Sequence, residues 1–469
     1  MAFGLFKKKT YADSVYRNGH LYTLDPETEG ATAIACKDGK VMRAGSEDDI
    51  APLIGPDTEV TDLAGRFLVP GFIDLCGTPA ADVMEGSYLK LHPGLSAEEV
   101  AAMAEEWAAS HAPCEFILAY GWFPEEGELP VLDNACPGIP LLIIGEDSIS
   151  MRLNKTAQEM VKERAEAETF AVSITPNYVF NTIVALDYAG MSRKAFAIAE
   201  DYAKRGVTSV LNLERCTFFD NMYRNLLLEF FQAGLIKQRY FGSFPLKRML
   251  APMSVVYNLD RKRTACSELQ GLVNFNTLLI TASSEEKNAV YMSGAYLKDM
   301  CAAAADKGYS IRLNAMDKAM TLQGMDALGS LSTSYKKAAF SVAFDAEVSE
   351  QEKADVYTGD LYECPLNAPL PLAGSGEEML TQRTEGAAWR LGEHGLGSLM
   401  EGKSADFAVF SVDPCQISTP EEFEALRADL TVLAGRTVYD SSLGESAADW
   451  FREFDAQLEE VFSEVETEE

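Results

Sequence analysis

The chain has 469 residues, 47% of them apolar, and its 72 acidic and 40 basic residues give a formal net charge of −32. This length allows two or three domains, or one large barrel with additions. A charge of this sign repels nucleic acid and anionic membrane surfaces, so we expect neither as a partner.

Targeting signals and disulfides are not expected. The basic N-terminal stretch MAFGLFKKKT is not followed by an apolar segment, and no window reaches the roughly 18 uninterrupted apolar residues of a membrane span. The nine cysteines are scattered and contain no C-x-x-C pair, which argues against a disulfide framework and a structural zinc site. We therefore expect a cytoplasmic protein.

Both ends of the chain have the character of β-structure. Residues 13–62 contain two alternating runs joined by the turn Lys37-Asp38-Gly39-Lys40, and similar runs return at 405–413 and 430–440. Each part is too small to bury a core alone. The sequence therefore predicts one composite β-sandwich domain built from residues 1–66 and 395–440.

The long central segment, residues 67–394, predicts an α/β barrel, which needs about 250 residues. A helical run at 192–204 stops at Gly206 before an apolar strand, and the run at 288–307 stops at Gly308 before the next. This repeated unit indicates a parallel sheet with helical crossovers. The predicted strands are 67–74, 116–120, 140–145, 207–213, 239–245, 273–280, 309–314 and 338–344.

The C-terminal segment, residues 441–469, predicts an acidic amphipathic helix. Its apolar residues fall on one helical stripe, which includes Trp450, Phe451 and Phe454. We expect this stripe to pack on the barrel of the same chain. The alternative is a contact between two copies, which would make the protein a homo-oligomer.

Several motifs in chain order resemble the amidohydrolase superfamily, and within it the exoenzyme-regulatory and N-acyl hydrolase branch. They are DLAGRFLVPGFID (62–74), the segment from FILAYGW to RLNKTA (116–157), GVTSVLNLE (206–214) and GSLMEGKSADFAVFSVDP (397–414). The resemblance implies a distorted (β/α)8 barrel, a composite β-sandwich, and hydrolysis by water bound to one or two divalent ions, usually zinc. Histidines, a carboxylated lysine and an aspartate at strand ends would hold the metal.

The positions that match those metal ligands carry other residues. In FLVPGFIDLCGTPA, the two histidines of the first strand are matched by Cys76 and Thr78. The lysine position is nearest to Asn274, and a later histidine is nearest to Asn314. A threonine hydroxyl and an amide are poor ligands for zinc, and a single cysteine makes a weak site. We therefore expect no bound metal and no other cofactor.

The four histidines of the chain do not fall at predicted strand ends of the barrel. They are His20, His92, His111 and His394. The resemblance implies three or four histidines at such ends, so this count indicates that the family's usual metal centre is lost.

Acidic residues near the predicted strand ends remain as candidates for catalysis. By their match to the family's motifs, these are Asp147, Asp317 and Asp360. Two carboxyl groups in close proximity could perform acid/base chemistry without a metal. The alternative is that these acids only cap and solvate the mouth of the barrel.

Three hypotheses follow from the sequence. The first is an amidohydrolase-fold protein that has lost hydrolysis and binds a small molecule or a protein. The second is an atypical hydrolase of non-peptide C–N bonds that uses Cys76, Asp147, Asp317 and Asp360. The third is a subunit that assembles through its C-terminal helix.

Overall fold

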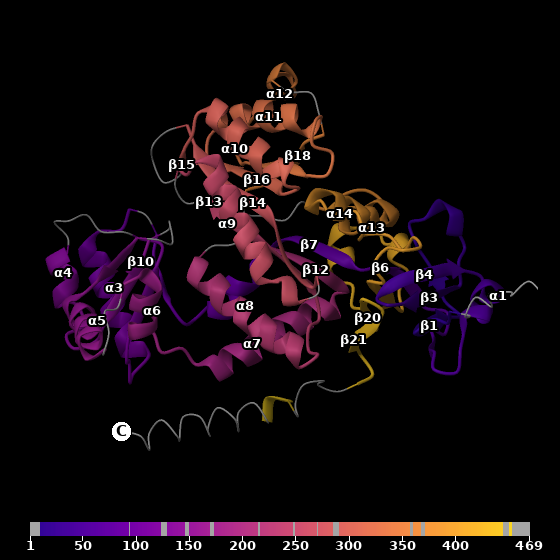
Figure 1. Ribbon diagram of the computed structural model, residues 1–469, viewed down its shortest axis with the longest axis horizontal. Coiled ribbons are helices and arrows are strands. Elements are labelled where there is room, and N and C mark those ends of the chain that lie inside the picture. The colour runs from indigo at the N-terminus through magenta and orange to yellow at the C-terminus, as the bar shows by residue number, and fades with distance from the viewer. Residues whose placement is uncertain are drawn as a thin grey trace, which may run out of the picture. The chain divides into compact units, whose positions relative to one another are not determined.

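The computed structural model of the protein describes residues 10–92, 94–122, 129–145, 150–168, 173–213, 216–246, 249–269, 271–284, 290–356, 360–366, 371–443 and 450–452 (Figure 1). The chain divides into two compact units. The first contains Met1–Gly77, Ala197–Leu213 and Glu229–Trp450, and the second contains Thr78–Phe196, Glu214–Leu228 and Phe451–Glu469. Neither unit is continuous in sequence, since the chain passes between them several times.

A parallel sheet lies at the centre of the first unit. In the described part of the chain its order is β18-β17-β16-β14-β13-β12-β7, with a short strand β15 on β14. The strands are β7 (Phe72–Gly77), β12 (Val207–Asn212), β13 (Arg239–Leu246), β14 (Val273–Ser283), β15 (Val290–Tyr291), β16 (Ser310–Ala315), β17 (Phe340–Ala343) and β18 (Tyr362–Cys364). The expected mixed α/β class is confirmed, and the sheet is curled and open rather than a closed barrel.

The barrel remains open because two predicted strands pair elsewhere. Residues 116–120 and 140–145 form β9 and β10, which belong to a separate sheet of the second unit, ordered β11-β10-β9-β8 among the described residues. Its strands are β8 (Leu89–Lys90), β9 (Ile117–Tyr120), β10 (Leu141–Ile144) and β11 (Met151–Leu153). The helices of this unit are α2 (Pro79–Met84), α3 (Ala97–Ser110), α4 (Leu129–Asn134), α5 (Lys155–Ala167) and α6 (Pro176–Ile183).

The run 67–74, predicted as a single strand, forms parts of two strands in different sheets. β6 (Phe67–Pro70) pairs antiparallel with β19, whereas β7 begins at Phe72 and pairs with β12. Gly71 separates them, and a Cβ atom at this position would lie 2.1 Å from the Thr208 hydroxyl. The chain can therefore pass this close to β12 only without a side chain.

The two ends of the chain meet in one sheet. Its order is β2-β6-β19-β20-β21, which joins N-terminal and C-terminal strands. The strands are β2 (His20–Leu21), β19 (Phe407–Phe410), β20 (Leu430–Leu433) and β21 (Arg436–Asp440), together with β6. A second sheet, β4-β3-β1-β5, contains β1 (Ser14–Arg17), β3 (Ala33–Lys37), β4 (Lys40–Gly45) and β5 (Glu59–Asp62), and the short helix α1 (Glu47–Ile50) follows β4.

Helices cover the parallel sheet and set the positions of its strands. The predicted run 288–307 corresponds to α10 (Gly294–Asp306), which the Ser293 hydroxyl caps and which ends before Gly308 at a φ of 75°. Its apolar face packs with α11 (Lys318–Ser332) on β14 and β16 around buried Met300, Leu313 and Leu328. The remaining helices are α7 (Tyr188–Lys204), α8 (Thr217–Gln232), α9 (Pro252–Ala265), α12 (Glu350–Val356), α13 (Gly376–Arg383), α14 (Glu385–Leu391) and α15 (Pro420–Glu424).

Some sequence-based expectations concern segments that the structure describes only in part. The predicted C-terminal helix 441–469 lies largely outside the described residues, although the ring of Trp450 packs edge-to-face on Phe230 at 5.7 Å. All nine cysteines are free thiols. Of the helices in the described ranges, none has both the length and the apolar character needed to cross a membrane.

Candidate functional site

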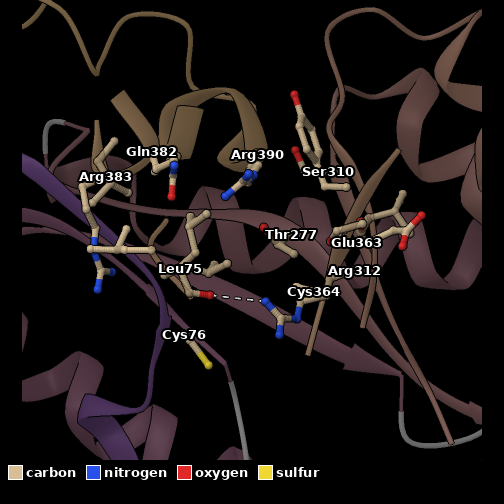
Figure 2. Close-up of a pocket in the computed structure, with 17 residues that line it drawn as sticks. Leu75, Cys76, Thr277, Ser310, Arg312, Glu363, Cys364, Gln382, Arg383 and Arg390 are labelled. Carbon is tan, nitrogen blue, oxygen red and sulfur yellow. Dashed lines mark hydrogen bonds between the residues drawn. The ribbon is translucent and has the colours of Figure 1, made fainter. Parts of the chain in front are cut away.

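A pocket that opens to solvent lies between the parallel sheet and helices α13 and α14 of the first unit (Figure 2). Its empty space, counted together with the open solvent at its mouth, is about 780 Å³. Helices α13 and α14 both pack on β7, so they hold the cavity closed on that side. The apolar part of the wall comprises Ile73, Leu75, Leu211, Ile311, Leu372 and Ala387. Polar side chains project into this wall from both the sheet and the helices.

Arg312 brings a buried positive charge into the cavity from the middle of β16, with an exposed fraction of 6%. Its Nη1 donates to the carbonyl oxygen of Leu75 at 3.3 Å, and its Nε donates to Asn314 Oδ1 at 3.4 Å. Both bonds are long. Among the described residues, Nη2 has no hydrogen-bond partner although it is buried.

Arg390 enters the cavity from the opposite side, from α14. Figure 2 shows its side chain pointing from the helix towards the sheet that carries Arg312. Its guanidinium lies 5.6 Å from the ring centre of Tyr362, and in the described structure its buried Nε has no hydrogen-bond partner. Burial lowers the pKa of Arg390. α14 ends one residue later, where Gly392 adopts a φ of 78° as the C-cap.

Arg383 also lines the cavity, but its positive charge is compensated by acidic residues of the fold. Its Nη2 forms an ion pair with Glu424, and the charge of Asp74 acts on it as well. Figure 2 shows its side chain directed away from Arg390. The three arginines therefore differ, because only Arg312 and Arg390 retain buried nitrogen atoms without a partner in the described structure.

Two residues of β18 complete the polar wall. Glu363 accepts a hydrogen bond from Lys353 Nζ at 2.6 Å, so its charge is balanced from within the fold. Burial raises the pKa of the Cys364 thiol, and the charges of Arg312 and Arg390 both oppose that rise. Both guanidinium groups therefore lie near enough to Cys364 for their charges to act on its thiol.

The residues that match the first-strand histidines lie in different settings. Cys76 lines the cavity at the end of β7, and its backbone N–H donates to Asp74 Oδ1 at 2.9 Å. Thr78 is the first residue of the second unit, and its hydroxyl donates to Asp82 at 3.0 Å within α2.

The two asparagines at former ligand positions are not brought together. Asn274 is the second residue of β14, whereas Asn314, near the end of β16, pairs in register with Thr281. Seven residues of strand separate Asn274 from Thr281, which corresponds to about 23 Å. Asn314 is buried and contacts Arg312 through its side-chain oxygen.

The two acidic candidates within the described residues, Asp317 and Asp360, do not line the cavity. Asp317 caps α11, and its carboxylate accepts hydrogen bonds from Met320 N, Ser283 and Ser284. Burial would raise its pKa, but these hydrogen bonds outweigh burial and lower it to about 2. Asp360 is exposed, precedes β18, and pairs with Lys336 at 3.2 Å. Asp147 lies outside the described residues.

The described residues do not fit a metal centre. No group of three or more histidine, cysteine, aspartate or glutamate side chains within these ranges could hold an ion. Three of the four histidines pack on aromatic rings away from the cavity. His20 stacks on Phe67, His111 stacks on Trp107, and His394 packs against Trp389. No chemical step is therefore derived through a metal.

The cavity arginines were missed by sequence reasoning, which looked for metal ligands and acids. A signal was present for Arg312, because it is the single charged residue in the otherwise uncharged strand YSIRLNA. Charged residues are almost never fully buried without a partner, so such a position points to a function. Arg390 carries no comparable signal, since arginine is common on helices.

The fold and the site define an α/β protein with a curled parallel sheet and a covered cavity. Residues 373–439, which include α13, α14 and the C-terminal strands β19 to β21, match the model of the amidohydrolase family. This match, the curated relatives and the motif resemblance support placing the chain in the amidohydrolase superfamily.

The curated relatives match over limited segments. The exoenzymes regulatory protein AepA of Pectobacterium carotovorum is 27% identical over 30% of this chain and 33% of its own length. An imidazolonepropionase of Symbiobacterium thermophilum is 40% identical over 15% of this chain and 17% of its own. The matches thus span about a third of the length of the first relatives.

Solved structures share the fold over most of the chain. An uncharacterised metal-dependent hydrolase from Pyrococcus furiosus has a TM-score of 0.51 at 15% identity, covering 86% of this chain and all of its own. An adenosine deaminase from Xanthomonas campestris with bound zinc has a TM-score of 0.50 at 13% identity, covering 97% and 99%. The expectation of no cofactor is contradicted by these neighbours, which are metal-dependent and zinc-bound enzymes and point to a metal cofactor.

Proposed function

We propose that this protein binds a small molecule in the cavity between the parallel sheet and helices α13 and α14, and that it does not hydrolyse that molecule. The observation that carries this proposal is the cavity itself. It combines an apolar wall with polar groups that converge from the sheet and the helices, which is the usual composition of a ligand site. A binding role is compatible with the amidohydrolase fold because function depends on the site residues.

The state of the candidate acids supports binding over hydrolysis. Asp317 accepts hydrogen bonds from the backbone and two serines, and its low pKa makes it a weak base. Asp360 is exposed and paired with Lys336. Neither acid lines the cavity, so neither can reach a molecule bound there.

The proposal is tested with a variant that fills the cavity. Ala387 is buried on α14 and lines the cavity, so Ala387→Met should occupy part of its volume. We expect compounds from a chemically mixed library to raise the melting temperature of the wild-type protein and not that of Ala387→Met. Ala388→Met is a suitable control, because Ala388 is also buried on α14 but is not among the residues that line this cavity.

Hydrolysis is measured in parallel with N-acyl amino acids and zinc supplied. We expect no turnover above the rate without protein. If every library compound leaves the wild-type melting temperature unchanged, the binding proposal is wrong. Turnover that requires the protein would replace it with a catalytic function.

Hydrolysis of non-peptide C–N bonds is the second candidate function. It is supported by the names of the relatives, which include an N-substituted formamide deformylase and imidazolonepropionases. In this case Cys76, Asp147, Asp317 and Asp360 would carry the reaction, and Cys76→Ser would abolish turnover. If the half-buried Cys76 thiol has no catalytic role, the same variant should keep any turnover and lose only a little stability.

We also propose the finer features of the architecture. A composite β-sandwich from both chain ends is supported by a buried cluster that unites Tyr16 and Ile34 of one sheet with Leu68, Phe407 and Val432 of the other. A cytoplasmic location is supported by the free cysteines. Self-association through residues 441–469 would be tested by light scattering of a chain that ends at residue 441, where a loss of mass beyond the deleted segment is expected.

A further inference from the structure

We infer that the cavity takes an organic carboxylate with an apolar body, and that Arg312 and Arg390 bind the carboxylate group. This inference rests on the proposed function, because it names the chemical class of the small molecule bound in the same cavity. It depends on the partners of the two arginines, on the acids around them and on the composition of the wall.

The first support is the cost of burying Arg312 without an anion. The exposed fraction of Arg312 is 6%. Its hydrogen bonds in the described structure go to a backbone carbonyl oxygen and an amide oxygen, both at more than 3.2 Å. A buried charge is costly unless an opposite charge and short hydrogen bonds compensate it. A bound anion would provide both, since the unpartnered Nη2 belongs to a side chain that lines the cavity.

The second support is that, among the described residues that line the cavity, none is an acid without a cation of its own. Glu363 is the acidic residue among those that line the cavity, and Lys353 neutralises it at 2.6 Å. Glu424 and Asp74 act on Arg383. The charges of Arg312 and Arg390 therefore remain uncompensated in the described structure.

The third support is that the two arginines act on one place. Their charges both affect the Cys364 thiol, and Figure 2 shows them approaching the space between the sheet and α14 from opposite sides. Each has one buried nitrogen atom without a partner, Nη2 in Arg312 and Nε in Arg390. A carboxylate has two oxygen atoms that can accept hydrogen bonds from two arginine donors.

The remaining wall selects the body of the ligand. Leu75, Leu211, Ile311 and Leu372 surround the polar region with apolar side chains. Such a surface stabilises a bound aliphatic or aromatic chain by burying its apolar area. It does not stabilise a small hydrated ion such as inorganic phosphate. The chain's charge of −32 also disfavours ligands that carry several negative charges.

The test uses the full-length protein and four defined probes. Hexanoate carries both required features, hexanamide lacks the charge, acetate lacks the apolar chain, and inorganic phosphate is a different anion. Binding is measured by isothermal titration and by the shift in melting temperature, at constant ionic strength so that general salt effects cancel. The variants are Arg312→Gln and Arg390→Gln, and Arg383→Gln is the matched control because Arg383 lines the same cavity but is ion-paired.

We expect hexanoate to bind the wild-type protein and Arg383→Gln with similar affinity. In Arg312→Gln and Arg390→Gln its dissociation constant should rise about 10-fold or more, because each variant removes one charged donor. Hexanamide, acetate and phosphate should each bind at least about 10-fold more weakly than hexanoate. Arg390→Lys keeps the charge and should recover part of the affinity, which separates charge from damage to the fold.

Several outcomes would overturn the inference. Equal binding of hexanamide, or hexanoate binding that is unchanged in both arginine variants, would show that the carboxylate is not recognised here. Phosphate binding that depends on both arginines and matches hexanoate would assign a different anion. If hexanoate does not bind, but a neutral library compound raises the melting temperature of the wild type and not of Ala387→Met, the proposed function stands and only the carboxylate inference fails. If no compound binds, both fail.

Discussion

Two arginines of the same parallel sheet differ in how the surrounding residues compensate their charge. Arg239 begins β13 and binds both carboxylate oxygens of Asp406, at 2.6 and 3.1 Å, and also the Ser404 hydroxyl. Arg312 lies on β16, two strands away in the sheet, and in the described structure its hydrogen bonds are long and go to neutral oxygens. The comparison teaches that Arg239 is part of the structure, whereas the charge of Arg312 is available to a ligand.

The acid–base properties of the buried arginines follow the same division. Burial would lower the pKa of Arg239, but the charge and hydrogen bond of Asp406 outweigh burial and raise it. Arg390 lines the cavity with Arg312 and forms no ion pair with a carboxylate in the described part of the chain, and burial lowers its pKa. An anion bound between Arg312 and Arg390 would supply Arg390 with a compensating negative charge, as Asp406 does for Arg239, and would raise the pKa of Arg390.

The largest expected effect comes from breaking the structural pair. Arg239→Gln leaves Asp406, which is 6% exposed, as a buried carboxylate without its cation, so we expect unfolding to cost about 3 kcal/mol less. Urea titration followed by circular dichroism measures this loss. Lys336→Gln, which breaks an exposed pair with Asp360, is the control and should change stability by less than about 0.5 kcal/mol. Equal effects of the two variants would contradict the structural role of Arg239.

A smaller effect is expected for a carboxylate that has all its partners. The pKa of Asp317 falls from its ordinary value of 3.8 to about 2, so the charged form stabilises the fold. This contribution is complete above the ordinary pKa and is lost as the pH falls towards 2. Asp317→Asn should therefore lower stability by about 1 kcal/mol at pH 6 and by much less at pH 2.

The measurement for Asp317 is a series of urea titrations from pH 6 to pH 2, and Asp360→Asn is the control. Asp360 is 80% exposed, so its variant should follow the wild type throughout. A difference between wild type and Asp317→Asn that stays constant over this range would show that the carboxylate charge does not stabilise the cap.

The smallest expected effect comes from Arg312. Arg312→Met replaces a poorly compensated buried charge by an apolar chain of similar length, so stability without ligand should change by less than about 1 kcal/mol or increase. The same substitution at Arg239 should cost as much as Arg239→Gln. If Arg312→Met destabilises the protein as strongly as Arg239→Met, Arg312 holds the sheet together and the contrast between the two residues disappears.

Local patterns were sufficient for much of the fold. The strands around 207–213 and 309–314, the glycines that end the preceding helices, and the β-strands at both chain ends were predicted because each depends on a short periodic pattern. The family was recognisable for a related reason, since its motifs at 62–74 and 397–414 are contiguous in sequence. The placement of the site was not predictable in this way. Asn274 and Asn314 were each matched to the family within a single strand, and such a match does not show whether two residues on different strands lie close together.

The sequence by itself determined the α/β class and indicated the superfamily, because these depend on residue identities and short-range order. Only the tertiary structure decided that β9 and β10 pair in a separate sheet and that Asp317 caps a helix. It also decided that Arg312 and Arg390, 78 residues apart, line one cavity. Strand pairing and the burial of a charge depend on partners far away in the chain, which no local pattern specifies.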